Sequence, residues 1–202
     1  MKMPTCLLLL AGILAPLAAS ASDLDSLTAN CNGCHGKDGA SQWSDVPTIA
    51  GIDAFVHSEA LYTYQDEGRP CAESKYRTGD TSRAATTMCA IAAKLSDEDI
   101  EALSAHYSEL PFVPAKQNFD AALASAGKAI HDKECSRCHS DGGSNPEDET
   151  SILAGQWVDY LRASIAEFQS GDREKPKQGL EKIGALSDDD VNALLNYYAS
   201  QQ

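Results

Sequence analysis

Two short stretches of this sequence combine two cysteines with a histidine at one fixed spacing. The Cys-x-x-Cys-His order occurs at Cys31, Cys34 and His35, and again at Cys135, Cys138 and His139. In this pattern two thiols can bond to the vinyl groups of a porphyrin while the adjacent imidazole coordinates the iron, which is how c-type haem is attached. Each copy therefore predicts one covalently bound haem.

A Cys-x-x-Cys pair alone is also typical of a redox dithiol or of half a zinc site. Here both copies carry the histidine, and the chain begins with an export signal. Residues 1–21 combine a basic start at Lys2, an apolar core at Leu7–Leu17 and small residues at Ala19–Ala21. The apolar run is too short for a membrane span. We therefore expect a periplasmic protein with no transmembrane segment, and two haems rather than zinc.

Charge and cysteine content narrow the function further. The chain has 16 basic and 30 acidic residues, and loss of Lys2 with the signal gives a net charge of −15. Such a surface disfavours nucleic acid and anionic lipid, and favours a partner protein with a basic docking face.

Of the seven cysteines, Cys6 lies in the signal and four lie in the motifs. An oxidising compartment then favours a disulfide between Cys71 and Cys89, with free thiols or a regulatory pair as the alternative.

The chain is an internal duplication. At an offset of 104, the motifs align, Ile49-Ala50-Gly51 aligns with Leu153-Ala154-Gly155, and Arg69 aligns with Arg173. Beyond that the offset is 91, where Leu95-Ser96-Asp97 aligns with Leu186-Ser187-Asp188. The first half thus carries 13 extra residues between Arg69 and Leu95, and this interval contains Cys71 and Cys89.

Each half has the pattern of three helices around its motif, and no strand pattern competes. We expect first helices at 24–30 and 120–133, second helices at 52–65 and 156–169, and last helices that start at Ser96 and Ser187 as N-caps. The apolar stripe of each last helix should pack on the first helix. Loops are expected at 36–45 and 141–150. The domain assignment is a signal peptide at 1–21, domain 1 at 22–110, a Pro-stiffened linker at 111–118 and domain 2 at 119–202.

With these residues in place, the sequence resembles the diheme cytochrome c4 family over the whole mature chain. The likeness is greatest to the cytochrome subunit of flavocytochrome c sulfide dehydrogenase, and it rests on Pro114–Gln117, Phe119-Asp120, His131–Lys133, Ile152–Trp157 and Tyr198–Gln202. The resemblance implies an all-α fold of two tandem class I cytochrome c domains, each wrapped around one covalently bound haem. It also implies a partner, either an FAD-containing flavoprotein subunit or another periplasmic redox protein. No flavin is expected in this chain itself.

The resemblance also implies the remaining iron ligands. Class I domains usually supply a Met as sixth ligand, and Met88, just before the last helix of the first half, is the one mature Met. At the equivalent place the second half has Gly179, so its haem is either open or bound by Lys175 or Lys177. The other histidines, at 57, 106 and 131, align with apolar or aromatic residues and are expected to be packing positions. A Pro carbonyl normally accepts a hydrogen bond from the ligand histidine, which assigns Pro47 to His35 and its counterpart Ser151 to His139.

Two functions of different class remain. The first is electron transfer from a periplasmic donor, either a sulfide-oxidising flavoprotein or another redox protein, to an acceptor. The second is a diheme enzyme that acts on a small sulfur compound at the second haem, which lacks a Met. No acid–base or nucleophile constellation surrounds the second motif, and no output domain supports a haem-based sensor. We therefore expect an electron carrier or an electron-transfer subunit rather than a catalyst.

Overall fold

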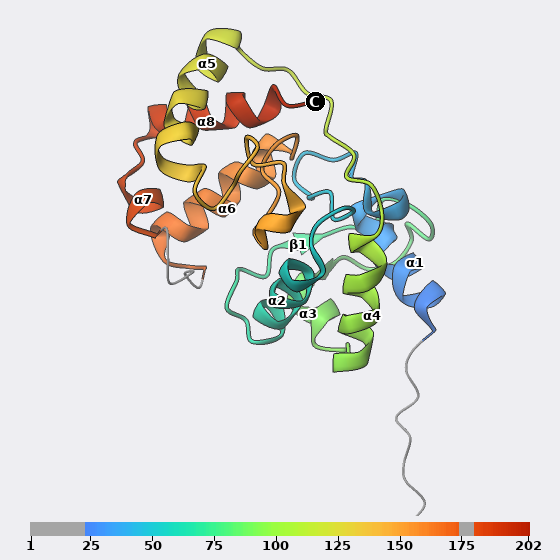
Figure 1. The fold of residues 1–202 in the computed structure, drawn as a ribbon. Coiled ribbons are helices and arrows are strands. Elements are labelled where there is room, and N and C mark those ends of the chain that lie inside the picture. Colours follow the sequence, from blue (N-terminus) through green and yellow to red (C-terminus); the bar gives the residue numbers. More distant parts are fainter. Residues whose placement is uncertain (1–22, 174–179) are drawn as a thin grey trace, which may run out of the picture.

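The computed structural model describes residues 23–173 and 180–202, and these form a mainly helical protein (Figure 1). The expected signal segment at 1–21, together with Lys175 and Lys177, lies outside the described residues. The α-helices are α1 (Leu24–His35), α2 (Ala54–Gln65), α3 (Met88–Ala92), α4 (Asp97–Ser108), α5 (Ala121–Ile130), α6 (Val158–Ser170), α7 (Leu180–Ala185) and α8 (Asp188–Ala199). Short 3-10 turns occupy Lys37–Gly39 and Pro146–Asp148, a π-helical turn occupies His131–Cys135, and two strands, β1 and β2, occupy Glu73–Ser74 and Thr86–Thr87.

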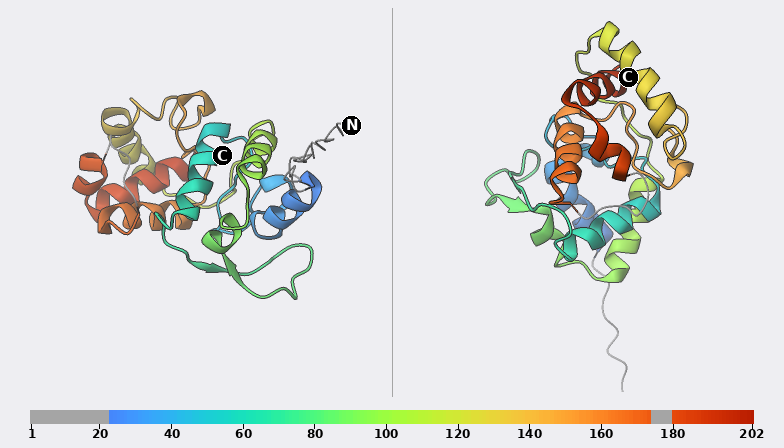
Figure 2. Two further views of the ribbon diagram at one scale, coloured as in Figure 1. Left: turned by 90° about the horizontal axis from the view of Figure 1, so that it is seen from below. Right: turned by 90° about the vertical axis from the view of Figure 1, so that its left-hand side faces the viewer.

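The helices form two groups that lie side by side (Figures 1 and 2). Helices α1, α2 and α4 of the first half correspond to α5, α6 and α8 of the second. Figure 2 shows α1 on the side of the first half that faces away from the second half. The predicted helical fold is confirmed, and the helix bounds differ from the expected ones by only a few residues, except that α1 continues through the first motif.

The duplication extends to individual hydrogen bonds. The side-chain amide of Gln65 donates to the carbonyls of Ala92 and Leu95, at 2.9 and 3.0 Å. The equivalent amide of Gln169 donates to Ile183 and Leu186, both at 3.1 Å. In each half this glutamine therefore ties the second helix to the turn that precedes the last helix. The 13 extra residues lie between the two ends of this contact, because Gln65 and Ala92 are 27 positions apart whereas Gln169 and Ile183 are 14 apart.

The last helix of each half begins where the sequence predicts. Ser96 and Ser187 each accept a hydrogen bond from the third backbone N–H of the helix, and Asp99 and Asp190 bond back to the cap residue, which completes a capping box. The apolar stripes of α4 and α8 are buried, as Leu103 and Leu194 show at 2 % exposure each. Helix α5 crosses α8 so closely that a Cβ on Gly127 would meet the backbone of Ala193 and Leu194.

The expectation that no strand would form is wrong for the 13-residue excess. There β1 and β2 pair antiparallel, with Glu73 opposite Thr87 and Ser74 opposite Thr86. The two threonines are β-branched residues that favour extended backbone, and the adjacent disulfide holds the two strands together. Strands of two residues are too short to show the alternation of polar and apolar residues from which strands are predicted. The stretch between the second and last helices of each half, where no helix is expected, also contains a short helix, α3 in the first half and α7 in the second.

The two halves are joined by hydrogen bonds between buried groups. Gln156, 1 % exposed, receives the backbone N–H of Thr48 and donates to its carbonyl, each at 2.9 Å. Nearby, the indole of Trp157 donates to the carbonyl of Ser41 at 3.0 Å, and the backbone N–H of Tyr160 donates to that of Ser44, also at 3.0 Å. The start of α6 therefore packs on the loop that follows the first motif.

The segment between the halves is itself bound to the second half. The N–H of Ala115 donates to the carbonyl of Gly155 at 2.7 Å, and Ala115 is 4 % exposed. The side-chain amide of Gln117 donates to the carbonyl of Gln156 at 2.8 Å. Pro111 and Pro114 restrict the backbone, and these hydrogen bonds fix the connector against the second half.

Candidate haem-binding sites

The first motif ends α1, and its histidine is held from inside the protein. His35 is 7 % exposed, and its Nδ1 lies 2.9 Å from the carbonyl oxygen of Pro47. This contact confirms the predicted partner. A hydrogen bond from Nδ1–H to a carbonyl fixes the tautomer in which Nε2 has a free lone pair. Burial lowers the pKa of this imidazole, which favours the neutral form that can bind a metal.

The second motif holds its histidine in the same way. His139 Nδ1 lies 3.1 Å from the carbonyl oxygen of Ser151, the position equivalent to Pro47, and 3.2 Å from the hydroxyl of Thr150. Burial again lowers the pKa of the ring. In both halves Nδ1 faces a carbonyl oxygen, which leaves Nε2 as the ring nitrogen that could bind a metal. The accepting carbonyl is thus retained although the proline is replaced by serine.

The state of the cysteines also fits thioether attachment. Cys71 and Cys89 form the predicted disulfide, whereas Cys31, Cys34, Cys135 and Cys138 are free. Burial raises the pKa of the Cys31 thiol to about 11, so this thiol is neutral. Within residues 23–173 and 180–202, no three His, Cys, Asp or Glu side chains converge as a structural zinc site requires.

A segment of the 13-residue excess covers the first motif. The ring of Tyr76 lies over Gly33, where an added Cβ would come within 2.6 Å of Tyr76 Cδ1. The backbone N–H groups of Arg77 and Thr78 both donate to the Gly33 carbonyl, at 2.7 and 3.1 Å. We call residues 75–78 the strap. No local sequence pattern predicts this contact, and the excess length of the first half is the signal that points to it.

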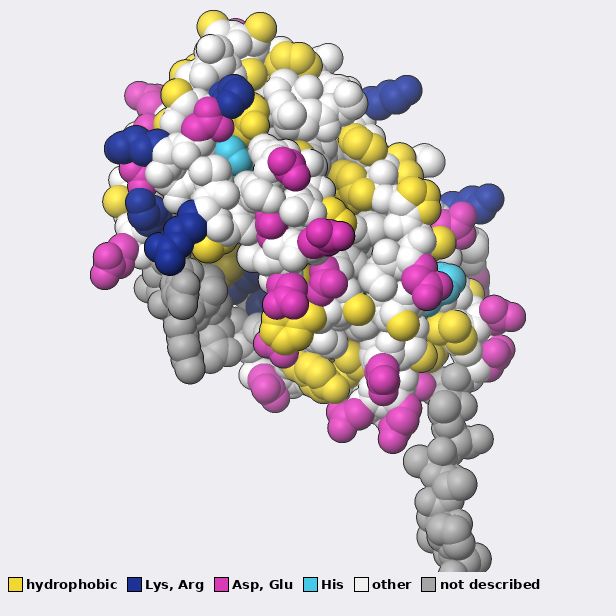
Figure 3. Space-filling model, in the orientation of Figure 1, with side chains coloured by type: hydrophobic (Ala, Val, Ile, Leu, Met, Phe, Trp, Pro, Cys, Tyr) yellow, Lys and Arg dark blue, Asp and Glu magenta, His cyan; other side chains and the backbone are white. Residues whose placement is uncertain are grey.

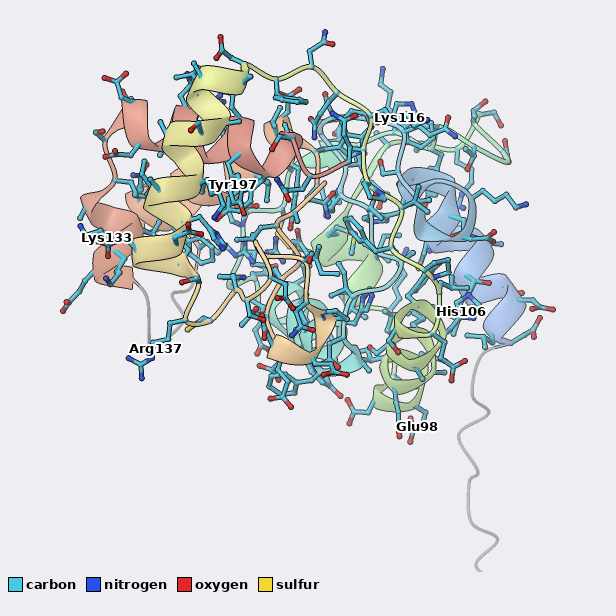
Figure 4. All side chains as sticks on the ribbon, turned by 45° about the horizontal axis from the view of Figure 1, so that its top comes forward. Glu98, His106, Lys116, Lys133, Arg137 and Tyr197 are labelled. Atoms are coloured by element: carbon cyan, nitrogen blue, oxygen red, sulfur yellow. A yellow bond between two sulfur atoms is a disulfide. The ribbon has the colours of Figure 1, made fainter. Side chains whose placement is uncertain are left out.

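The second motif lacks such a cover among the described residues. Helix α5 passes into a π-helical turn at His131–Cys135, in which the Ser136 N–H donates to the His131 carbonyl at 2.9 Å. Cys138 is exposed, and Figure 4 shows Arg137, between the two cysteines, projecting away from the molecule. Irregular turns of this kind are common at functional sites. The two attachment segments are therefore alike in sequence and different in surroundings.

Met88 is fixed by covalent and hydrogen-bonded neighbours on both sides. It lies before the last helix, as expected, and is the first residue of the short helix α3, which Thr87 caps by accepting from the Ala90 N–H at 3.0 Å. Thr87 also pairs with Glu73, and Cys89 is bonded to Cys71. The helix begins at this position because Thr87 supplies the cap. The Met88 side chain, half-buried, thus projects from a rigid segment.

The other histidines occupy packing positions, as expected. Nε2 of His57 lies 2.6 Å from the carbonyl oxygen of Ile49, and His131 lies 3.1 Å from the hydroxyl of Tyr198 through its Nδ1. The ring of His106 packs edge-on against Tyr107. The loop that contains Lys175, Lys177 and Gly179 lies outside the described residues.

Charge is unevenly distributed over the surface. On the face in Figure 3, acidic side chains gather over the lower part of the molecule, and lysines and arginines gather at its upper left. In the second half, Lys128 forms an ion pair with Asp132, and Lys182 forms one with Glu134. Within the described residues, no helix is both long and apolar enough to cross a membrane.

The sequence is similar to one protein family model and to several characterised cytochromes. The family described as cytochrome c oxidase, cbb3-type, subunit III matches residues 122–197. The thiosulfate dehydrogenase electron acceptor of Stutzerimonas stutzeri is 30 % identical over 84 % of this chain and 78 % of its own length. Cytochrome c4 of Azotobacter vinelandii is 28 % identical over 95 % of this chain and 94 % of its own length.

A solved structure agrees with these relatives. The crystal structure of reduced cytochrome c4 from Pseudomonas stutzeri superposes with a TM-score of 0.68 at 25 % identity, over 90 % of this chain and 100 % of that one. The repeated helices, the paired motifs and the relatives along nearly the whole chain agree with one another. The chain belongs to the cytochrome c4 family and is a diheme electron-transfer cytochrome c.

Proposed function

We propose that this protein is a periplasmic electron carrier in which the four motif cysteines attach two haems and the motif histidines bind their irons. The observation that carries the proposal is the orientation of His35 and His139, whose Nδ1 atoms both face a backbone carbonyl. When bound, each haem supplies reversible one-electron redox chemistry. Residues 22–110 and 119–202 would each form one cytochrome c domain around its haem, with 111–118 between them.

The protein's own part in this function is positioning and tuning. The carbonyls of Pro47 and Ser151 orient the imidazoles and raise their basicity. Met88 is proposed as sixth ligand of the first iron, and the segment around it is anchored by the disulfide and by β1. For the second iron, Lys175 or Lys177, or an open position, remains the proposal.

We further propose that the electron donor is a dehydrogenase that oxidises a reduced sulfur compound. The relative from Stutzerimonas stutzeri, and another from Thiomonas intermedia, are named electron acceptors of thiosulfate dehydrogenase. The sequence resemblance to the cytochrome subunit of flavocytochrome c sulfide dehydrogenase favours the same class of chemistry, with an FAD-containing subunit as donor. Export by residues 1–21 would place the protein in the periplasm with either donor.

Two measurements test these proposals. Mass spectrometry of the mature protein should show two haem additions, and acid-acetone should leave the colour on the polypeptide. Rapid mixing of the oxidised cytochrome with a thiosulfate or sulfide dehydrogenase and its substrate should then reduce haem faster than substrate alone does. Oxidation of thiosulfate or sulfide by the cytochrome without a dehydrogenase would instead favour the enzyme alternative.

Substitution of Met88 tests the ligand assignment. In Met88→Ala, the weak near-infrared-edge absorption band of Met-ligated ferric haem should disappear, and the potential of one haem should fall because a thioether stabilises ferrous iron. The matched control is Ile91→Ala, which shortens a half-buried side chain on the same helix and should leave the band in place. A band that survives in Met88→Ala would contradict the assignment.

A further inference from the structure

Each attachment motif has an exposed arginine on its outer side, and the two halves place it there differently. In the second half the residue before the second cysteine is Arg137, which projects away from the molecule (Figure 4). The equivalent residue of the first half is Gly33, over which the ring of Tyr76 lies. Arg83, itself exposed, stacks on that ring with its guanidinium carbon 3.7 Å from the ring centroid. Gly33, Tyr76 and Arg83 line one surface hollow.

Further cations lie at the first motif. The thiol of Cys34 donates to the carbonyl of Lys75 at 3.5 Å, and the Lys75 side chain is exposed. Burial raises the pKa of this thiol, whereas the positive charges of Arg77 and Arg83 lower it, so both guanidinium groups act on the sulfur. The strap and the loop after it therefore bring three cations to the edge of this motif.

Only part of this positive charge is neutralised by described protein groups. Arg77 forms two hydrogen bonds with the carboxylate of Asp45, at 2.6 and 2.5 Å. Within residues 23–173 and 180–202, no carboxylate lies at ion-pair distance from Lys75, Arg83 or Arg137. These three side chains are exposed, so their charges are available to a partner at the surface.

The cations at the motifs contrast with the charge of the whole chain. The sequence has 16 basic and 30 acidic residues, and helices α2 and α4 contain acidic residues but no lysine or arginine. An acidic protein would therefore be repelled by most of the surface and attracted at the motifs. Such a charge pattern orients an approaching partner and raises the rate of association.

We propose that the outer sides of the two motifs are docking surfaces for the acidic faces of redox-partner proteins. The inference rests on the proposed function, because each motif would carry a haem whose edge is bonded to its cysteines. Cys138 is exposed and Cys34 is half-buried, so these sulfurs would bring the haem edge to the surface. Electrons then enter or leave where the arginines hold the partner. The net charge alone favours a basic partner, whereas the local charge at the motifs assigns an acidic one.

The test uses the holoprotein with both haems confirmed by mass. The probe is a small acidic ferredoxin, whose reduced iron–sulfur cluster passes one electron to a ferric haem. The motif variant combines Arg83→Glu with Arg137→Glu. At about 0.1 M salt, where charges more than about 10 Å from the contact are screened, haem reduction after rapid mixing should be about tenfold slower in this variant than in the wild type.

The matched control combines Lys116→Glu with Arg162→Glu, which changes the net charge by the same amount. Both side chains are exposed, and Figure 4 shows Lys116 on the opposite side of the molecule from Arg137. The control should react within about twofold of the wild-type rate at about 0.1 M salt. At about 0.5 M salt the three proteins should react alike, because steering by charge is then screened.

Three results would overturn the proposal. Equal rates of the motif variant and the control would show that the local charge at the motifs does not govern association. Slowing of the motif variant that persists at about 0.5 M salt would indicate a damaged haem site rather than a lost docking surface. Binding of the wild type to phosphatidylglycerol vesicles that is lost in the motif variant would assign the arginines to a lipid surface. Absence of haem from the wild-type protein would refute the proposed function instead.

Discussion

His57 is a buried base whose protonation state is set by the fold. It is 9 % exposed, and its Nε2–H donates to the carbonyl of Ile49, two residues after Pro47. Burial is the main reason that its pKa is lowered to about 4, and the nearby charge of His35 acts in the same direction. The neutral ring, on α2, thus holds the loop whose Pro47 carbonyl faces His35.

We expect acid to destabilise the protein through His57. In the unfolded chain the imidazole has a pKa of about 6.5, so between pH 6.5 and pH 4 the unfolded state binds the proton first and stability falls as pH falls. The loss amounts to about 3 kcal/mol at most. His57→Gln, which can still donate a hydrogen bond, should lose less stability between pH 7 and pH 4.5 in denaturant titrations.

His106→Gln, half-buried on α4, is the matched control for this measurement and should keep the wild-type pH dependence. An equal loss on acidification in His57→Gln and in the wild type would contradict the assignment.

At the scale of elements, the close crossing of α5 and α8 determines how the second half is built. Gly127 permits it, because any side chain there would meet the backbone of Ala193 and Leu194. The buried residues Leu161, Val191, Leu194, Leu195, Tyr197 and Tyr198 form one cluster around this crossing. Helix α5 leads directly into the second motif, so the crossing also determines the position of this motif and of His139 within it.

Gly127→Ala should therefore destabilise the protein although alanine favours helix. The gain in helix propensity is about 1 kcal/mol, and we expect the forced separation of two backbones to exceed it by about 2 kcal/mol. Gly184→Ala is the matched control, because Gly184 also lies in a helix and nothing is within 4 Å of an added Cβ. It should be neutral or stabilising. Thermal unfolding of the two variants side by side measures the difference.

How far the sequence predicts these elements depends on how each is encoded. The caps and apolar stripes of helices α4 and α8 are local sequence patterns, so Ser96 and Ser187 correctly predict where these helices begin. The strap depends instead on backbone contacts between Gly33 and residues 77 and 78, which no local pattern records. The carbonyl partners of the two motif histidines are predictable because the spacing from His35 to Pro47 repeats from His139 to Ser151.

At the scale of the whole molecule, the halves meet through a small number of directional contacts. Gln156 satisfies both backbone groups of Thr48, which is fully buried. The counterpart of Gln156 in the first half is Ile52, so the contact is made once and does not follow the duplication. One side chain thus contributes much of the specificity with which the two halves are oriented.

We expect Gln156→Leu to loosen this contact. The substitution leaves the N–H and C=O of Thr48 buried without partners, each at a cost of about 1–3 kcal/mol. Amide hydrogen exchange should become faster at Thr48 and at Tyr160, whose N–H also crosses the contact, while α8 stays protected. Gln42→Leu, an exposed change in the same loop, is the control. Unchanged exchange at Thr48 would show that the other contacts suffice.

The disulfide has a further consequence for how the chain responds to a protease. The stretch from Gly79 to Ala85 is exposed throughout, and the guanidinium of Arg83 rests on the ring of Tyr76 at 3.7 Å. Trypsin should cut after Arg83 in the folded protein. Cys71 and Cys89 lie on either side of that cut, so the two pieces should migrate as one band on a gel until a reductant is added. The nicked protein would then keep Met88 joined to the first half by sulfur alone.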